Sequence, residues 1–339
     1  MKKEKLSDFE KRISDYYLWS NPSVGKSWRK GRKNTRRAEK HITHAIEKKD
    51  FKLFKTFGSG PLGQGYNASE YHNKASKMLE THIDWQLEKY VELTGGKIED
   101  LIFPNIGSIV GYHDDSLSKD VVIPYTAPRL GYYLNTSFNF YKDKHPEERK
   151  IDVLEVGGGW GALCYLARKN REDVGIYTIV DIPTTIVVAA YFLNEAGLSV
   201  LLPNEVKKFS KEELSKVDCV FLETQQLDSV KPNFFNLSIS TACMPELSKV
   251  LIGRYLREMS RLSEVAYIDS TQEGRGPILR NYLLKKQSHR IWEPACDLEV
   301  EMKKTPITAY YPKWYVHCPV NEADKIFEYY ITFFKEKKK

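Results

Sequence analysis

The chain has 339 residues, of which 41% are hydrophobic and 12% aromatic, which suffices for one large domain or two ordinary ones. Residues 1–50 carry 15 Lys and Arg against 7 Asp and Glu, so the net charge of +7 arises entirely from the N-terminal segment. No apolar run approaches the roughly 20 residues of a membrane-spanning helix, and the charged start MKKEKLSDFEKR lacks the apolar stretch of a signal peptide. We therefore expect a cytoplasmic protein without a membrane span.

The basic stretch KSWRKGRKNTRRAEKH (26–41) has two interpretations. It is either an electrostatic footprint for nucleic acid or anionic lipid, or a solvated helix face or a contact to a phosphorylated substrate. We favour the second interpretation and keep nucleic acid as the alternative partner.

The five cysteines, Cys164, Cys219, Cys243, Cys296 and Cys318, are widely spaced and contain no C-x-x-C pair. This spacing predicts neither a disulfide framework nor a zinc site. Free, buried thiols are the expected state.

The N-terminal part of the chain, residues 1–145, is expected to be mostly helical. Apolar residues recur every three or four positions over 68–96, which predicts an amphipathic helix that ends at a pair of glycines. Residues 56–67 contain four Gly and one Pro and are expected to form a loop, and the segment 102–135, interrupted by Pro and Gly, is expected to be a loop-rich lead into a helix at about 127–142. We expect this region to bind or cover the acceptor substrate and to offer a surface for a homo-oligomer.

From residue 146 to 339 the pattern changes to strands that alternate with helices. Such alternation predicts an α/β fold with a doubly wound, mostly parallel sheet. Strands are predicted at 151–157, 176–181, 199–203, 218–223, 233–240, 264–270 and 310–320, and helices at 160–170, 183–197 and 244–263.

A glycine-rich segment, EVGGGWG (155–161), directly follows the first of these strands. Missing Cβ atoms permit a tight turn and let a ligand approach the backbone, and doubly wound sheets bind ligands at the carboxyl ends of strands where the strand order reverses. Asp181 ends the second strand, and a carboxylate there can accept hydrogen bonds from both hydroxyls of a ribose. The pattern predicts a nucleoside-containing cofactor.

Two cofactors fit this prediction. Gly157-x-Gly159-x-x-Ala162 matches the dinucleotide fingerprint, so a NAD-dependent dehydrogenase stays open. Glu155 favours the other cofactor, since a carboxylate two residues before the first glycine would repel a pyrophosphate. It suits the positively charged amino group or sulfonium of S-adenosylmethionine.

The pattern Glu155-x-Gly157-x-Gly159-x-Gly161 resembles the first motif of class I S-adenosylmethionine-dependent methyltransferases, and Asp181 matches their ribose-binding position. More narrowly, EVGGGWG and YTIVDIP resemble the bacterial sugar O-methyltransferase group, over about residues 102–270 and most closely over 151–193. The resemblance implies a Rossmann-like methyltransferase sheet, S-adenosylmethionine as cofactor, and a sugar hydroxyl of a nucleotide-linked sugar or glycan precursor as acceptor.

One position departs from that group. Its members often have Ser-x-x-Glu-Met-Pro after the fourth strand, where this chain reads STACMP (240–245). Cys243 therefore stands where the group has a glutamate, and a role of that glutamate does not carry over.

The candidate site residues follow from the expected position of the glycine turn. Catalytic candidates are loop or strand-end residues that could take the proton of a hydroxyl: His113, Asp269 and Glu273. Arg129 and Arg275 could bind an anionic group of the substrate. Mg²⁺ is allowed but not indicated, and it would require clustered carboxylates as ligands. The expected cofactor contacts are Glu155, Gly157, Gly158, Gly159, Trp160, Gly161, Asp181, Ile182 and Ser238.

Other functions stay open beside sugar methylation. An RNA ribose methyltransferase would use the same sheet and the basic N-terminal stretch, and another small molecule could be the acceptor. Enzymes that methylate base amino groups usually carry an Asn/Asp-Pro-Pro-aromatic run after the fourth strand, which NFFNLSIS (233–240) lacks. A protein that kept the fold without catalysis is the remaining alternative.

Overall fold

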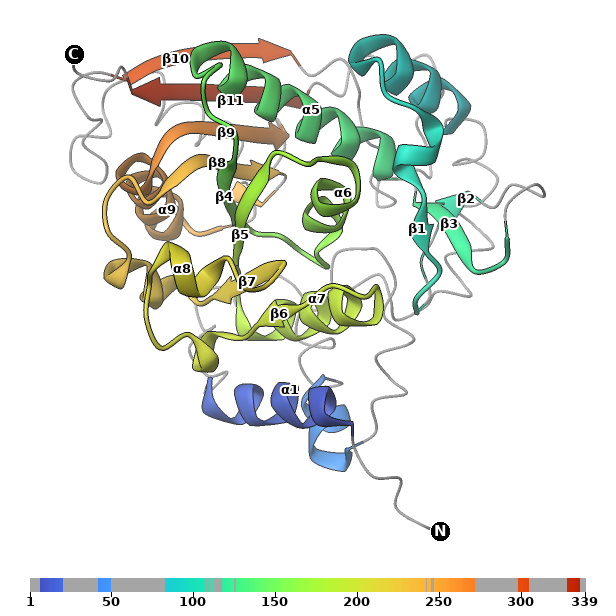
Figure 1. Ribbon diagram of the computed structural model, residues 1–339, viewed down its shortest axis with the longest axis vertical. Coiled ribbons are helices and arrows are strands. Elements are labelled where there is room, and N and C mark those ends of the chain that lie inside the picture. Colours follow the sequence, from blue (N-terminus) through green and yellow to red (C-terminus); the bar gives the residue numbers. More distant parts are fainter. Residues whose placement is uncertain are drawn as a thin grey trace.

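The computed structural model describes residues 7–20, 42–49, 83–107, 109, 111–112, 118–124, 126–241, 243–244 and 247–271, and the backbone of 298–304 and 328–335. Within these ranges the body of the protein is an eight-stranded sheet with helices on both faces (Figure 1). The strand order is β10-β11-β9-β8-β4-β5-β7-β6. The six strands from β9 to β6 are parallel, and β11 and β10 add an antiparallel edge. The predicted α/β, doubly wound, mostly parallel sheet is confirmed.

The strands of this sheet are β4 (Ile151–Val156), β5 (Val174–Val180), β6 (Val200–Leu201), β7 (Cys219–Leu222), β8 (Phe235–Thr241), β9 (Ser263–Thr271), β10 (Leu298–Lys304) and β11 (Glu328–Lys335). The helices are α1 (Asp8–Trp19), α5 (Ala127–Lys144), α6 (Ala162–Asn170), α7 (Pro183–Glu195), α8 (Lys211–Leu214) and α9 (Lys249–Leu262), with short 3-10 turns η4 (Ile98–Leu101), η5 (Pro203–Glu205) and η6 (Thr224–Ser229). Residues 42–48 and 83–94 are also helical.

The predicted elements between 127 and 270 are present, with boundaries that differ by a few residues. The helix expected from 244 begins only at Lys249, where Ser248 caps it by accepting from the amide of Leu251. The strand predicted at 310–320, the basic stretch 26–41 and most of the helix predicted at 68–96 lie outside the described residues.

A small antiparallel sheet occupies part of the segment that was expected to be loop. Its strands β1 (Phe103–Pro104), β3 (Val121–Pro124) and β2 (Gly111–Tyr112) are short, and their order is β1-β3-β2. Phe103 and Val122 are fully buried in the main core, and this packing holds the small sheet in place. The strands are too short to show the alternation of apolar and polar residues that predicts a strand.

Two hydrophobic cores fill the space between the sheet and its helices. The larger core lies on the face covered by α5, α6 and α7, and the smaller core lies under α9. The larger core also includes Ile13 of α1 and residues of the 83–94 helix, so the expected boundary near residue 145 runs through one continuous core.

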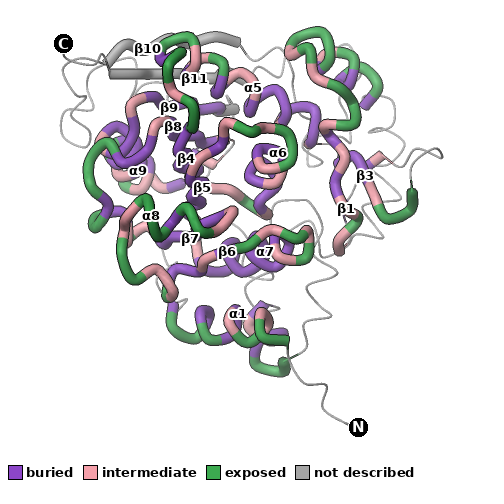
Figure 2. Tube along the Cα trace, in the orientation of Figure 1, coloured by how far each residue is buried: buried purple, intermediate pink, exposed green. Residues whose placement is uncertain are grey.

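Helix α7 is buried on all sides, since every residue from Pro183 to Leu193 is buried. A helix that is apolar all round needs cover on both faces. The sheet covers one face, and α1 packs against the other (Figures 1 and 2). Helix α1 is amphipathic and begins with a capping box in which Ser7 and Glu10 satisfy each other's amides.

The strand order reverses between β4 and β8. From β4 the chain proceeds to β5, β6 and β7 on one side of the sheet, and then returns to place β8 and β9 on the other side. The carboxyl ends of β4 and β8 therefore form the topological switch point, the place where ligands bind in sheets of this type.

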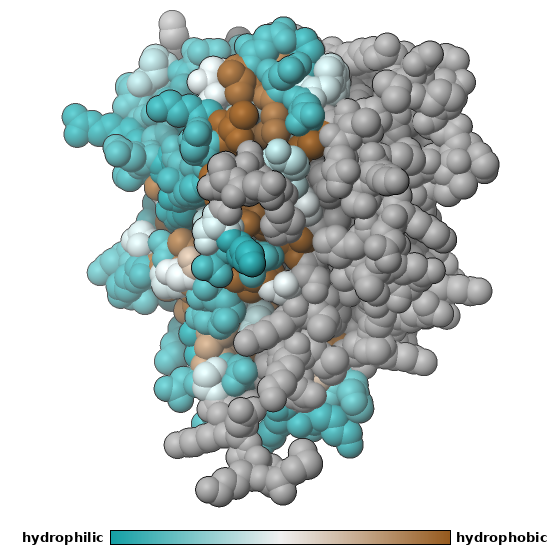
Figure 3. All heavy atoms as spheres, turned by 90° about the vertical axis from the view of Figure 1, so that its right-hand side faces the viewer, coloured by the Kyte–Doolittle hydropathy of each residue, from teal (hydrophilic) through white to brown (hydrophobic). Residues whose placement is uncertain are grey.

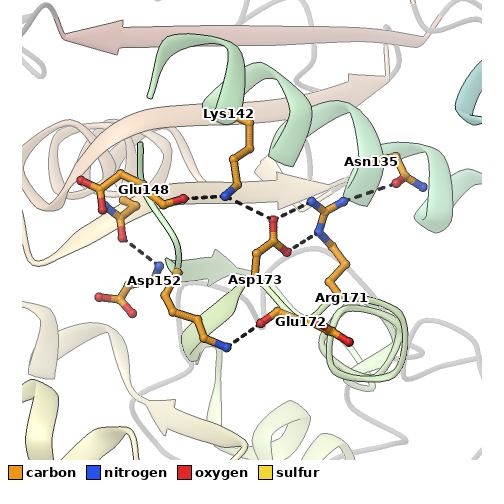
Figure 4. A network of polar contacts seen from close by, with 9 residues as sticks. Asn135, Lys142, Glu148, Asp152, Arg171, Glu172 and Asp173 are labelled. Atoms are coloured by element: carbon orange, nitrogen blue, oxygen red, sulfur yellow. Dashed lines mark hydrogen bonds and ion pairs between the residues drawn. The ribbon is translucent and has the colours of Figure 1, made fainter. Parts of the chain in front are cut away.

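Polar contacts tie the opposite, amino edge of the sheet to α5 (Figure 4). The guanidinium of Arg171 makes two hydrogen bonds, of 2.9 and 2.8 Å, to the carboxylate of Asp173, and Lys142 approaches the same carboxylate at 3.8 Å. On the face shown in Figure 3, the described part of the surface is mostly hydrophilic, with apolar residues gathered along the middle.

An irregularity between β4 and β5 lets a side chain replace a strand hydrogen bond. The register steps from Ile151↔Val174 to Val153↔Tyr177, so β5 contains one extra residue. The Oδ1 atom of Asp152 accepts from the amide of Ile176 at 2.8 Å, and a Cβ atom on Gly175 would lie 2.3 Å from that oxygen.

We predict that the buried hydrogen bond from the Ile176 amide to Asp152 contributes more to the free energy of unfolding than the ion pair between Asp152 and Lys211 does. The Lys211 side chain is 60% exposed. Asp152→Ala should lower the free energy of unfolding by about 1–3 kcal/mol, because the Ile176 amide loses its acceptor. Lys211→Ala should cost less than about 1 kcal/mol. Urea unfolding of both variants measures this, and equal losses would contradict the account.

Candidate functional site

The glycine turn, residues 157–161, connects β4 to α6 through three left-handed positions. The φ angles of Gly157, Gly159 and Gly161 are +81°, +57° and +86°, values that L-residues with a Cβ atom adopt only at a cost. The turn is closed by a 2.9 Å hydrogen bond from the Gly161 amide to the Gly158 carbonyl.

Internal packing accounts for most of these glycines. A Cβ atom on Gly157 would lie 2.3 Å from Sγ of Cys243, one on Gly158 would lie 2.6 Å from Ile179, and one on Gly161 would lie 3.1 Å from Leu193. Gly159 differs, because a Cβ atom there would meet no described heavy atom within 4 Å, and the residue is exposed. The open side of the turn is therefore at Gly159.

Asp181 connects the turn to the end of β5. Its Oδ2 atom accepts from the Gly159 amide at 3.2 Å, and its Oδ1 atom accepts from the amide of Ile182, the N-cap residue of α7, at 2.7 Å. The carboxylate thus lies beside the open side of the turn, as the sequence predicted.

A second acid, Glu223, follows the neighbouring strand at the same level. Val180 pairs with Leu222, so Asp181 and Glu223 are the next residues on two adjacent parallel strands. Glu223 is 2% exposed, and its carboxylate accepts from the hydroxyl of Tyr16 at 3.1 Å and from the side-chain amide of Gln225. Burial raises the pKa of Glu223, and these two hydrogen bonds partly oppose the shift.

Glu223 is a site residue that the sequence analysis did not name. The available signal was its position, since it ends the predicted strand 218–223 just as Asp181 ends the strand before it. What the sequence lacked was the pairing of β7 with β5, which places the two acids side by side.

Glu155 was expected to be a charged side chain facing the ligand, but the structure shows it buried. The side chain is 2% exposed, and it accepts a hydrogen bond of 2.9 Å from the hydroxyl of Tyr177 on β5. Burial raises the pKa of Glu155 to about 8; the Tyr177 bond lowers it and the charge of Asp181 raises it. The carboxyl group is therefore mostly protonated at neutral pH.

The side chains of Trp160 and Ser238, which were expected to contact the cofactor, make contacts within the protein. The Trp160 ring packs against Phe192 of α7 and Phe103, with centroids 4.7 and 5.4 Å apart. Ser238 lies inside the sheet, opposite Leu154, and its hydroxyl bonds to that of Ser263. Because Ser238 is fully buried and three residues short of the strand end, we correct its assignment and leave it out of the site.

Two side chains from the far side of the switch point complete this end of the sheet. Cys243 contacts the turn at Gly157. The hydroxyl of Tyr255 on α9 bonds to that of Thr224 at 2.5 Å, beside Glu223. Burial raises the pKa of Tyr255, and the proximity of Cys243 and Asp181 adds to the shift.

Asp269 and Arg129 are brought to the same face of the sheet. Asp269 pairs with Thr241 near the carboxyl end of β9 and is fully buried. Two residues earlier, the Tyr267 ring packs against Tyr133 of α5 at 5.9 Å, and the buried Arg129 guanidinium lies 5.5 Å from the centre of the Tyr133 ring. The first turns of α5 therefore cover the end of β9.

Three candidates, His113, Glu273 and Arg275, lie outside the described residues. Among the residues that the structure describes, no group of three or more His, Cys, Asp or Glu side chains is placed to hold a metal ion. In the same part of the chain, no helix is long and apolar enough to cross a membrane.

No family model and no curated protein matches this chain. Solved structures align with it at low scores. The [4+2]-cyclase SpnF aligns with a TM-score of 0.39 and 16% identity over 66% of this chain and 86% of that one. The O-methyltransferase TomG from Streptomyces achromogenes, in complex with SAM, gives 0.36 and 13% over 60% and 81%.

Phosphoethanolamine N-methyltransferase 2 from Haemonchus contortus, in complex with S-adenosyl-L-methionine, aligns with a TM-score of 0.35 and 12% identity. The alignment covers 60% of this chain and 53% of that one. Likeness at such scores gives no information about the activity of this chain.

Because Glu155 is buried, we expect the free energy of unfolding to depend on pH. Between pH 4.5 and about 8 the folded state holds a proton that the unfolded state releases, so the free energy of unfolding should fall as the pH rises across this interval. Glu155→Gln keeps a neutral acceptor for Tyr177 and should flatten that fall. Urea unfolding at pH 5, 6, 7 and 8 tests this, with Glu212→Gln as an exposed control; an unchanged pH slope in Glu155→Gln would be contrary to it.

Proposed function

We propose that this protein is an S-adenosylmethionine-dependent O-methyltransferase whose acceptor is a sugar hydroxyl. The observation that carries the proposal is the open side of the glycine turn at Gly159, with Asp181 bonded to its amide. The sugar acceptor is supported by the resemblance of EVGGGWG and YTIVDIP to the bacterial sugar O-methyltransferase group.

The residues at the strand ends fit a nucleoside. The Asp181 carboxylate lies beside the open side of the turn, where it could accept from the two ribose hydroxyls, and the bare backbone at Gly159 allows close approach. Glu223, one strand further out, could accept from the amino group of an adenine base if the side chains that cover it move when the ligand enters. These contacts would hold the nucleoside along the ends of β4, β5 and β7.

The same edge favours a cationic cofactor over a dinucleotide. Asp181 and Glu223 directly follow β5 and β7, and Glu155 is the next-to-last residue of β4. The Glu155 carboxyl group is mostly protonated in the ligand-free protein, but a pyrophosphate would meet the charge of Asp181 and would disfavour ionisation of Glu155. A cation above the turn would favour the ionised form of Glu155 and would be stabilised by it in return. This difference is the reason to rank a methyltransferase above a dehydrogenase.

The acceptor would lie on the β8–β9 side of the turn. When bound, S-adenosylmethionine supplies an activated methyl group, so the protein has to orient a hydroxyl oxygen and take its proton. Asp269 is our candidate for holding that proton, and Arg129 for binding an anionic group of the acceptor. Because Asp269 is fully buried, the proposal requires that the side chains covering it move when the acceptor enters.

Gly159→Arg should abolish binding of S-adenosylmethionine while the protein stays folded, because the new side chain would fill the open side of the turn. Gly197→Arg is the matched control: Gly197 has a φ of +85°, has no described atom within 4 Å of a Cβ, and follows α7 at the opposite edge of the sheet. Isothermal titration calorimetry and thermal melts of both variants measure this. Unchanged affinity in Gly159→Arg would refute the assignment.

Asp269→Asn should lower the rate of methyl transfer by about 10²–10⁴-fold if this carboxylate takes the proton, with cofactor affinity unchanged. The acceptor is found first, by screening nucleotide sugars and RNA with a labelled methyl donor, with and without Mg²⁺. A rate within about threefold of wild type would exclude Asp269 as the base, and transfer to RNA alone would replace the sugar by a ribose hydroxyl.

A further inference from the structure

We propose that helix α1 is part of the cofactor site and that Tyr16 is the residue that positions Glu223 for the base of the cofactor. This inference rests on the function proposed above and assigns a role to a segment outside the sheet. It also places α1 on the nucleoside side of the turn. Strand β7, which Glu223 follows, and strand β9, which carries Asp269, lie on opposite sides of β4, and α1 packs beside α7 (Figure 1).

The contact itself is buried and joins residues 207 positions apart. Tyr16 is 0% exposed, and its hydroxyl donates to Oε1 of Glu223 at 3.1 Å, while Gln225 donates to Oε2. Each carboxylate oxygen can accept two hydrogen bonds. Both oxygens are therefore fixed in position and still have capacity for the amino group of a ligand.

A second contact on the same face of α1 sets the position of Tyr16. Arg12, one turn earlier, makes two hydrogen bonds of 2.6 and 2.7 Å to the carboxylate of Glu205 in η5, and a third of 2.8 Å to the carbonyl of Val200 in β6. Residues i and i+4 lie on one face of a helix. The Arg12 contacts therefore fix the position of α1, and with it that of Tyr16, relative to the sheet.

The hydroxyl of Tyr16 also keeps Glu223 an acceptor. Burial favours the protonated form of this carboxyl group, and the donors Tyr16 and Gln225 oppose this. Removal of the Tyr16 hydroxyl should raise the pKa of Glu223 further. The ligand's amino group would then meet a carboxyl group that is less ionised and less well oriented.

The test compares two phenylalanine variants of the same helix. Tyr16→Phe removes the bond to Glu223, and Tyr17→Phe removes a similar bond, of 2.8 Å, to Thr43. Both tyrosines are buried, so both variants lose one hydroxyl from the interior. By titration calorimetry with S-adenosylhomocysteine at pH 7, Tyr16→Phe should bind about tenfold more weakly than wild type and Tyr17→Phe within about twofold of it.

Two further readouts separate positioning from general loosening of the fold. The affinity of Tyr16→Phe should begin to fall at a higher pH than that of wild type when the pH is lowered. S-inosylhomocysteine, which has a carbonyl group in place of the base amino group, should bind Tyr16→Phe no more weakly than it binds wild type. Combined with Glu223→Gln, Tyr16→Phe should add little further loss, because both changes act through one contact.

Equal affinities for Tyr16→Phe and Tyr17→Phe, or fully additive losses in the double variant, would overturn the role of Tyr16 while the proposed function stands. If Tyr16→Phe fails to fold, the Glu223→Gln variant decides: an affinity for S-adenosylhomocysteine equal to that of wild type overturns the inference. Failure of the wild-type protein to bind S-adenosylhomocysteine would overturn the proposed function and this inference with it.

Discussion

The arrangement of the site depends on one constraint, the left-handed backbone of the turn between β4 and α6. Three positions at positive φ within five residues let the chain reverse direction directly above the switch point of the sheet. Neighbouring side chains then pack onto Gly157, Gly158 and Gly161. The turn is thus held from inside, and only Gly159 is left facing outward with its amide bonded to Asp181.

This constraint explains why acidic groups gather at the same edge. The carboxyl ends of β4, β5 and β7 are adjacent. Glu155 is the next-to-last residue of β4, and Asp181 and Glu223 directly follow β5 and β7. Burial raises the pKa of Glu155 and of Glu223, and the charge of Asp181 adds to the shift of Glu155, so the edge is less stable than an apolar one would be. Such a cost is typical of sites where a ligand later supplies the missing charge.

The sequence predicted the parts of the fold that are encoded locally. The strand, the glycine turn, the next helix and Asp181 follow one another within about thirty residues. Each of these elements shows the spacing of apolar residues that is typical of its type. Parts that depend on distant pairing were missed. Glu223 becomes a site residue only because β7 pairs with β5, and the neutral form of Glu155 arises from burial under neighbouring elements.

The placement of other residues also depended on tertiary packing. Ser238 was assigned to the cofactor from its strand, yet its hydroxyl is satisfied within the sheet by Ser263. The sequence analysis explained the glycines by a tight turn and by ligand approach, whereas packing against Ile179, Leu193 and Cys243 accounts for three of them. Helix α1 was not singled out in the sequence, yet its buried face covers α7 and brings Tyr16 to Glu223.

The most direct test of this account is a crystal structure of the protein soaked with S-adenosylhomocysteine. The account predicts electron density for the nucleoside against the main chain of Gly159, with both ribose hydroxyls within hydrogen-bonding distance of Asp181 and the base amino group beside Glu223. Density elsewhere, or none at a saturating concentration, would contradict it.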